Sequence, residues 1–86
     1  MHYVYALLDL IIGKIYIGRT GDLRKRLKQH QQGKTWSTSR MGNLELIFYE
    51  AFKSKQDSIR RERYFKTSKG RSSLRQIIRD SINKVI

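Results

Sequence analysis

One acidic residue lies at a position where its helix is expected to be apolar. In the helix predicted to start at Ser54, Glu62 falls within the stripe that Ile59 and Phe65 define at 3.6 residues per turn. Burying a carboxylate costs several kcal/mol unless a cation or a metal ion compensates its charge. A chain of this size has only about 5 kcal/mol of folding free energy to spare. We therefore expect Glu62 to have a partner.

Two kinds of partner satisfy that requirement. In the structural alternative, Glu62 forms an ion pair with Arg26 or Lys66. In the functional interpretation, Glu62 is a metal ligand or a catalytic carboxylate. A single carboxylate suits one Mg²⁺ or Mn²⁺ ion, because these ions keep several waters and share the phosphate oxygens of a substrate.

Two more polar residues share the apolar stripe of an earlier predicted helix. Arg26 and His30 lie on the same side as Leu23 and Leu27, the only leucines of that helix. An inward guanidinium needs an anionic or aromatic partner, unless its stem lies along the core edge and its head reaches water. A histidine, with a pKa near 6.5, can serve as a base or a proton relay at neutral pH.

Tyrosines and a glycine near the start of the chain complete the set of candidates. The two-residue period of a strand places Tyr3 and Tyr5 on one face, and Tyr16 lies on the next strand, shortly before Gly18. A tyrosine in a small sheet is usually a core residue with a hydrated hydroxyl group. It acts as a base only where its pKa of about 10 is lowered toward neutrality. Gly18 would let another backbone or a phosphate approach closely.

The strands that should carry these tyrosines can be placed from composition. Residues 2–9, 14–18 and 44–50 are rich in β-branched and aromatic side chains, which is typical of strands. The four residues 10–13, Leu-Ile-Ile-Gly, connect the first two strands as a β-hairpin. Their apolar side chains are unusual for an exposed turn, and the sequence alone does not explain them.

Helices are predicted in three places. Residues 22–32 form the first, with Asp22 as its N-cap and Gly33 as its stop, and a loop follows at 34–43. A second helix runs from Ser54 to about residue 67.

That second helix is expected to open with a capping box formed by Ser54 and Asp57. Gly70 then breaks the pattern. The last amphipathic helix is marked by apolar residues at helical spacing: Leu74, Ile77, Ile78, Ile82 and Val85. The order β-β-α-β-α-α predicts an α+β fold, with a three-stranded antiparallel sheet flanked by helices.

Length and charge restrict the function. The 86 residues are expected to form a single domain, residues 1–86. Nineteen Lys and Arg against seven Asp and Glu give a net charge of +12, which attracts polyanions. Nucleic acid is the first candidate, with DNA favoured over RNA, and an acidic membrane surface is the second. Because the charges are spread along the chain rather than gathered on one helix face, we favour the phosphate backbone.

The chain contains no cysteine, so it has no disulfide partner and no thiolate metal site. That composition fits the cytoplasm. The first residues lack a basic segment and a small-residue cleavage site, so we expect neither a signal peptide nor a membrane span.

Several motifs now occur in the order found in a known family. Tyr3-Val4-Tyr5 stands where a GIY triplet would be, and Tyr16-Ile17-Gly18 is an intact YIG. The runs 16–30 and 51–71 also resemble segments of GIY-YIG nuclease domains, such as the domain at the amino end of a bacterial excinuclease. The likeness is greatest to the small stand-alone bacterial members. The first triplet departs from the pattern, and Ser58 replaces a small apolar residue.

The resemblance implies a role for each candidate residue. Tyr5 and Tyr16 would be the motif tyrosines, with Tyr16 preferred as the general base and His30 as the other candidate. Arg26 would be the catalytic arginine. Glu62 would be the sole protein ligand of one Mg²⁺ or Mn²⁺ ion. Substrate phosphate would be contacted by Arg19 and Lys66.

The function implied is metal-dependent endonucleolytic cleavage of DNA, in repair or recombination. Trp36 and the tyrosines would stack on exposed bases, favouring single strands, flaps or junctions. Two other hypotheses remain: a non-catalytic nucleic-acid-binding module of the same fold, and a basic structural or ribosome-associated protein.

Overall fold

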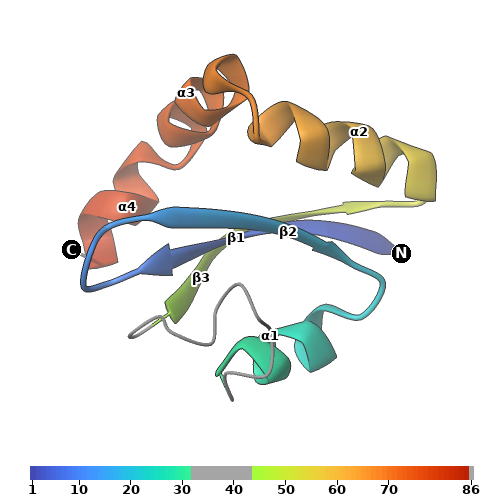
Figure 1. The fold of residues 1–86 in the computed structure, drawn as a ribbon, viewed down its shortest axis with the longest axis horizontal. Coiled ribbons are helices and arrows are strands. Elements are labelled where there is room, and N and C mark those ends of the chain that lie inside the picture. The colour runs from blue at the N-terminus through green and yellow to red at the C-terminus, as the bar shows by residue number, and fades with distance from the viewer. Residues whose placement is uncertain (32–43, 86) are drawn as a thin grey trace.

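The computed structural model describes residues 1–31 and 44–85 and confirms the predicted α+β class. Within those residues, three strands and four helices follow in the order β-β-α-β-α-α-α (Figure 1). They are β1 (His2–Asp9), β2 (Ile15–Thr20), α1 (Leu23–Gln31), β3 (Leu44–Phe52), α2 (Lys55–Phe65), α3 (Ser68–Ile77) and α4 (Arg79–Val85). The predictions for the loop 34–43, Trp36 and Gly33 lie outside the described residues.

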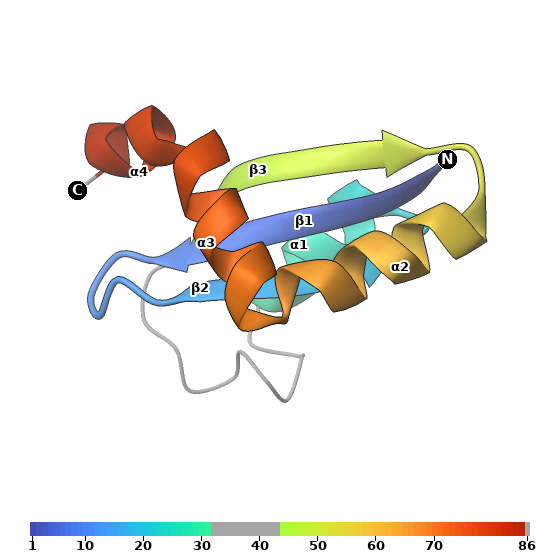
Figure 2. The ribbon, with the colours of Figure 1, turned by 90° about the horizontal axis from the view of Figure 1, so that it is seen from above.

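β1 is the central strand of an antiparallel sheet with the order β2-β1-β3. Tyr5 of β1 pairs with Gly18 on one side and with Tyr49 on the other. A register shift interrupts the β1–β3 pairing between Ala6 and Leu7. Helices α2 and α3 lie over one face of the sheet and α1 lies against the other (Figures 1 and 2). β2 is therefore an edge strand with helices above and below it.

The core lies between the sheet and the C-terminal helices. Val4 and Ala6 project from β1 toward Phe65, Leu74 and Ile78, and all five side chains are almost fully buried. The alternate side chains of β1 project to the α1 face by the two-residue period. Burial on both faces explains why β1 is a nearly continuous apolar run.

The hairpin between β1 and β2 is closed by a buried carboxylate. Asp9 is 2% exposed, and its Oδ1 accepts hydrogen bonds from the backbone N–H groups of Ile11 (2.9 Å) and Ile12 (3.3 Å). The backbone N–H of Gly13 donates to the carbonyl of Asp9, and Gly13 has a φ of 73°. This Asx-type turn explains the backbone conformation of the connection between β1 and β2. It leaves Ile11 and Ile12 exposed at 70% and 66%.

The C-terminal helices correct two predictions. Gly70 lies in the first turn of α3, where its N–H donates to the side chain of the N-cap Thr67. A Cβ at Gly70 would overlap the backbone of Tyr64, so this glycine permits close packing of α2 and α3 rather than breaking a helix. The predicted last helix is divided at Ile78, and Ile77, which was expected in the apolar stripe, is 53% exposed. No helix in the described part of the chain is long and apolar enough to cross a membrane.

Helix α1 begins as predicted and α2 does not. Asp22 Oδ1 accepts the backbone N–H of Lys25 at 3.1 Å, as expected for an N-cap. Ser54 occupies the N-cap position of α2, but its side chain makes no capping hydrogen bond. Asp57 pairs instead with Arg60, so the capping box is absent from this described helix. α2 also ends at Phe65, two residues before the predicted end.

Candidate active site

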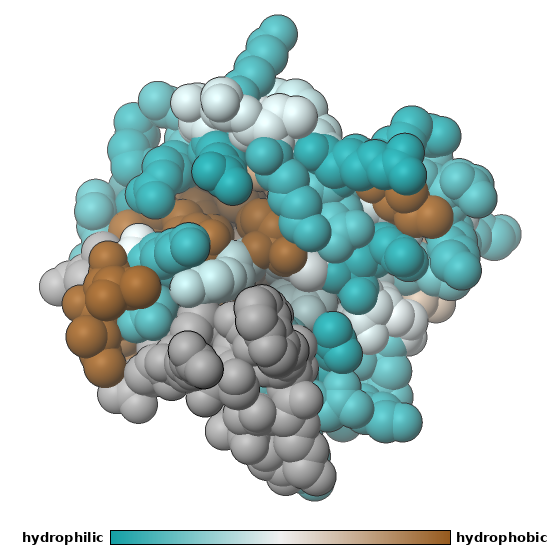
Figure 3. Space-filling view, in the orientation of Figure 1, coloured by the Kyte–Doolittle hydropathy of each residue, from teal (hydrophilic) through white to brown (hydrophobic). Residues whose placement is uncertain are grey.

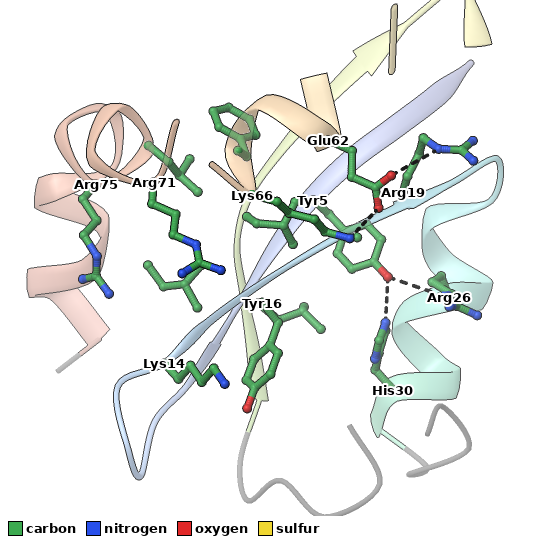
Figure 4. Close-up of a pocket in the computed structure, with 16 residues that line it drawn as sticks. Tyr5, Lys14, Tyr16, Arg19, Arg26, His30, Glu62, Lys66, Arg71 and Arg75 are labelled. Atoms are coloured by element: carbon green, nitrogen blue, oxygen red, sulfur yellow. Dashed lines mark hydrogen bonds and ion pairs between the residues drawn. The ribbon is translucent and has the colours of Figure 1, made fainter. Parts of the chain in front are cut away.

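A cavity of about 580 Å³ runs along the edge strand β2, between α1 on one side and α2 with α3 on the other (Figure 4). Figure 3 shows apolar side chains exposed between hydrophilic ones on this face of the molecule. The cavity is lined by all seven residues to which the family resemblance gave a role: Tyr5, Tyr16, Arg19, Arg26, His30, Glu62 and Lys66. The fold thus brings together residues that are up to 61 positions apart in the chain.

The wall formed by α1 is held by hydrogen bonds. The Tyr5 hydroxyl lies 2.7 Å from His30 Nε2, and Arg26 Nε donates to the same hydroxyl at 3.4 Å. Arg26 also donates to the side chain of Gln29 at 3.3 Å. His30 is only 7% exposed. The guanidinium predicted to be inward therefore has a phenol oxygen as a partner, and within residues 1–31 and 44–85 it forms no ion pair with a carboxylate.

Gly18 makes room for the tyrosine ring. Tyr5 lies opposite Gly18 in the β1–β2 ladder, and a Cβ at Gly18 would overlap the ring and hydroxyl of Tyr5. The absence of a side chain lets Tyr5 lie over the edge strand and reach the cavity. The close approach that the structure shows at Gly18 is made by a side chain from the neighbouring strand.

Burial sets the protonation of this wall. It raises the pKa of the Tyr5 hydroxyl above its ordinary value of about 10, and the Arg26 hydrogen bond and charge offset only part of that effect. Burial also lowers the pKa of His30 below 6.5, and the nearby positive charge of Arg26 adds to this. At neutral pH Tyr5 is a phenol and His30 is a neutral imidazole. Arg26 already donates to the phenol oxygen, so a natural arrangement has Tyr5 donating to His30 Nε2.

The wall formed by α2 is held by ion pairs. Glu62 Oε1 lies 3.6 Å from Arg19 Nε, and Oε2 lies 3.2 Å from Lys66 Nζ. The Glu62 side chain is 21% exposed and faces the cavity (Figure 4). It is therefore less buried than the helical wheel suggested. The predicted pairing with Lys66 is observed, and Arg19 takes the place that the sequence alternative gave to Arg26.

A separate ion pair orients the helix that carries Glu62. Arg61 donates to both carboxylate oxygens of Glu50 on β3, at 2.8 and 3.2 Å. Its guanidinium carbon also lies 4.3 Å from the ring centroid of Phe65. The bidentate pair with Glu50 ties α2 to the sheet, next to the residue that faces the cavity.

Tyr16 occupies a different part of the cavity. It projects from β2, and in Figure 4 its ring points away from Glu62. Lys14 Nζ lies 5.1 Å from the centroid of that ring. The two motif tyrosines therefore differ: Tyr5 belongs to the hydrogen-bonded cluster with Arg26 and His30, whereas Tyr16 stacks against a cation.

The structure adds three cations that the sequence did not single out. Lys14, Arg71 and Arg75 line the side of the cavity away from Arg26 and His30 (Figure 4). Within residues 1–31 and 44–85, none of the three forms an ion pair with a carboxylate. Arg71 and Arg75 are spaced one helical turn apart, which is the only signal in the sequence.

The donor set suits a divalent ion that binds together with a phosphate. Among the described residues, Glu62 is the one carboxylate that lines the cavity, and no group of three or more acidic or histidine ligands occurs. The cavity is also lined by six cations: Lys14, Arg19, Arg26, Lys66, Arg71 and Arg75. Such a site favours anions, so a metal ion held by one carboxylate needs phosphate oxygens to complete its ligands.

Known proteins resemble this chain in sequence and in fold. The family model described as the GIY-YIG catalytic domain matches residues 1–75. A UPF0213 protein of Bacillus pumilus is 39% identical over 67 residues, covering 77% of this chain and 67% of that protein. A UPF0213 protein of Streptococcus agalactiae is 35% identical over 77 residues, covering 87% of this chain and 85% of that protein. The solution NMR structure of a UPF0213 protein from Bacillus halodurans has a TM-score of 0.56 at 32% identity, covering 88% of this chain and 83% of that one.

Proposed function

The chain belongs to the GIY-YIG family of nuclease domains, and from this premise we propose that it is a metal-dependent endonuclease that hydrolyses a phosphodiester bond of DNA. One observation carries the proposal. The carboxylate of Glu62 and the cluster of Tyr5, Arg26 and His30 line one cavity although they come from opposite faces of the sheet. A phosphodiester placed between them would lie beside a carboxylate that can bind a metal ion, a fixed guanidinium and a group that can accept a proton.

Arg26 is the group best placed to stabilise the charge that develops on the phosphate. Its guanidinium is permanently charged, and its contacts with Tyr5 and Gln29 hold it in the cavity before substrate arrives. A preorganised donor of this kind lowers a barrier by about 3 kcal/mol. Arg19 and Lys66 add charge on the other wall and would move from Glu62 to the phosphate oxygens.

Proton removal from the attacking water is assigned to Tyr5 together with His30. Phenolate formation at Tyr5 is unfavourable because burial raises its pKa. The 2.7 Å contact offers another path, in which the Tyr5 oxygen takes the water proton while its own proton passes to His30 Nε2. Tyr16, the base that the family resemblance favours, is the alternative.

Glu62 would hold the divalent ion, Mg²⁺ or Mn²⁺. Its two oxygens face the cavity and pair with Arg19 and Lys66. Once a phosphate is bound, both cations can pair with the phosphate and free the carboxylate for the metal ion. The ion, when bound, would polarise a phosphate oxygen and stabilise the leaving alkoxide.

Nicking of supercoiled plasmid in Mg²⁺, Mn²⁺ and chelator tests the proposal, with branched DNA and RNA as further substrates. Glu62→Gln should abolish nicking while leaving DNA affinity within about twofold. Glu45→Gln is the matched control, since Glu45 is an exposed carboxylate on β3 away from the cavity. Wild-type nicking by Glu62→Gln, or nicking that persists in chelator, would reject the assignment.

A second function is favoured by one observation. Both oxygens of Glu62 are paired with cations, which is also what a purely structural ion pair looks like. In that case the chain is a nucleic-acid-binding module without catalysis. It would bind DNA with a steep salt dependence, a slope near −4.5 if about five phosphates are contacted, and would nick nothing in any metal.

A further inference from the structure

The tip of the β1–β2 hairpin is an apolar point on a strongly basic molecule. Ile11 and Ile12 are the most exposed large hydrophobic residues in the described part of the chain, at 70% and 66%. A brown, hydrophobic projection stands at the edge of the space-filling view, on the side where the β1–β2 hairpin ends in Figure 1 (Figure 3). The tip makes no contribution to the proposed chemistry, so its composition needs another explanation.

The tip is built to keep its shape. The Asp9 carboxylate, itself 2% exposed, accepts two backbone N–H groups of the turn. The carbonyl of Asp9 accepts the N–H of Gly13, and the N–H of Asp9 donates to the carbonyl of Lys14 at 2.9 Å. A turn with this many internal bonds presents its two isoleucine side chains with little loss of conformational freedom when they enter a partner.

The tip is continuous with the cavity. Lys14 follows the turn directly and lines the cavity beside Tyr16. Arg71 and Arg75 line the same part, and within the described residues none of these three cations is paired with a carboxylate. Three cations that have no carboxylate partner among the described residues therefore line the part of the cavity that adjoins the hairpin.

We propose that Ile11 and Ile12 form a wedge that enters the base stack of DNA at a branch or duplex end, and that Lys14, Arg71 and Arg75 hold the strand leading from the wedge to Glu62. This inference rests on the proposed function and adds a substrate class to it. Isoleucine is among the side chains that proteins insert between base steps, at a cost repaid by backbone contacts beside the opened step. Here those contacts are supplied by Lys14, Arg71 and Arg75.

The geometry sets where such a substrate would be cut. Seven positions separate Ile12 from Arg19. The distance between these two residues along the strand is therefore at most about 23 Å, at ~3.3 Å per residue. At ~3.4 Å per nucleotide along one strand, this equals at most about seven nucleotides. Cleavage is therefore expected within about seven nucleotides of the branch.

Nucleic acid is a better occupant of the tip than an acidic bilayer. Membrane-surface binding relies on a broad apolar face along a helix. Here the tip offers two exposed isoleucines, and the adjoining cations line the cavity.

Fluorescence of 2-aminopurine placed at the branch of a forked DNA tests the wedge without cutting, because the measurement is made in chelator. The wild-type chain should raise the fluorescence at least threefold. The double variant Ile11→Ser, Ile12→Ser should remove this rise and reduce the preference for fork over plain duplex at least tenfold. Ile77→Ser, which changes another exposed isoleucine at 53%, should behave as wild type.

The outcomes separate the wedge from the nuclease. A fluorescence rise that depends on Ile11 and Ile12 supports the wedge even if no metal ion promotes cutting. An unchanged rise and fork preference in the double variant overturn the wedge even if the chain cuts DNA. If the double variant lost binding to vesicles of phosphatidylcholine and phosphatidylserine but bound forked DNA as well as the wild type, the wedge would be overturned in favour of a membrane contact.

Discussion

The side chains on the α1 wall of the cavity meet through hydrogen bonds, whereas those on the α2 wall meet through ion pairs. Tyr5, Arg26 and His30 form a directional cluster whose histidine is 7% exposed. Glu62 and Lys66 are 21% and 54% exposed in their side chains. Partly exposed ion pairs contribute about 0 to 1 kcal/mol, so their partners exchange readily. The first wall is therefore preorganised, and the second is arranged to change partners when a phosphate enters.

The largest effect is expected from breaking the preorganised wall. Arg26→Ala removes the fixed guanidinium and should lower nicking about 100-fold, in line with ~3 kcal/mol for such a donor. Arg24→Ala, on the same helix but exposed and outside the cavity, should keep nearly full activity. Rates come from single-turnover nicking of plasmid. Equal nicking rates for the two variants would show that Arg26 takes no part in the reaction.

Gly18→Ala should have the next largest effect, because its Cβ would displace the ring of Tyr5. Overpacking of this kind costs about 1 to 3 kcal/mol, and nicking should fall at least tenfold. Gly21→Ala is the matched control, since a Cβ there meets nothing within 4 Å. Urea unfolding measures the stability and the plasmid assay the activity. If Gly18→Ala left both the stability and the nicking rate unchanged, the position of the Tyr5 ring would not matter for activity.

The pH dependence should follow His30. Its pKa lies below 6.5, and the neutral form is needed to accept a proton, so nicking should fall up to tenfold per unit as pH drops below that pKa. Stability changes in the same direction. From pH 6.5 downward the unfolded chain binds a proton that the folded chain does not, so folding weakens until the folded pKa is passed. His30→Gln should abolish both effects, and His2→Gln neither.

The smallest effect is expected on the exchangeable wall. Lys66→Gln frees one oxygen of Glu62 and should tighten Mn²⁺ binding in the absence of DNA about twofold, consistent with an exposed pair worth about 0.5 kcal/mol. Lys69→Gln changes an exposed lysine outside the cavity and serves as the control. Titration followed by Mn²⁺ electron paramagnetic resonance gives the affinity. Weaker binding in Lys66→Gln would contradict a competition between lysine and metal.

Local patterns predicted the elements well, because strand composition and helical period act over a few residues. β1 begins and ends where it was expected, and β2 and β3 differ only at their ends. The errors at Gly70 and Ile77 have another origin. Whether a glycine ends a helix or admits a neighbour depends on what packs against it, here the backbone of Tyr64. The division of the last helix at Ile78 likewise has no local breaker residue.

The candidate site was predicted as a set of residues but not as a set of contacts. The period of each helix placed Arg26 and Glu62 on inward faces, yet it could not show that each takes a partner from the sheet, Tyr5 and Arg19. The cations of the hairpin and α3 were missed for a related reason. Lys14 and Arg71 lie far apart in the chain, and only the fold brings them to one cavity.

A double-mutant cycle on the two walls tests the central claim most directly, because it asks whether they act on one phosphate. Single-turnover nicking rates would be measured for Arg26→Lys, Glu62→Asp and the combination, in Mg²⁺ with plasmid in excess of its dissociation constant. Groups that act as a unit give effects that do not multiply, so the combination should be about as slow as the slower single variant. If the fold-reductions of the two single variants multiplied in the combination, or if either single variant nicked at the wild-type rate, the two walls would not form one active site.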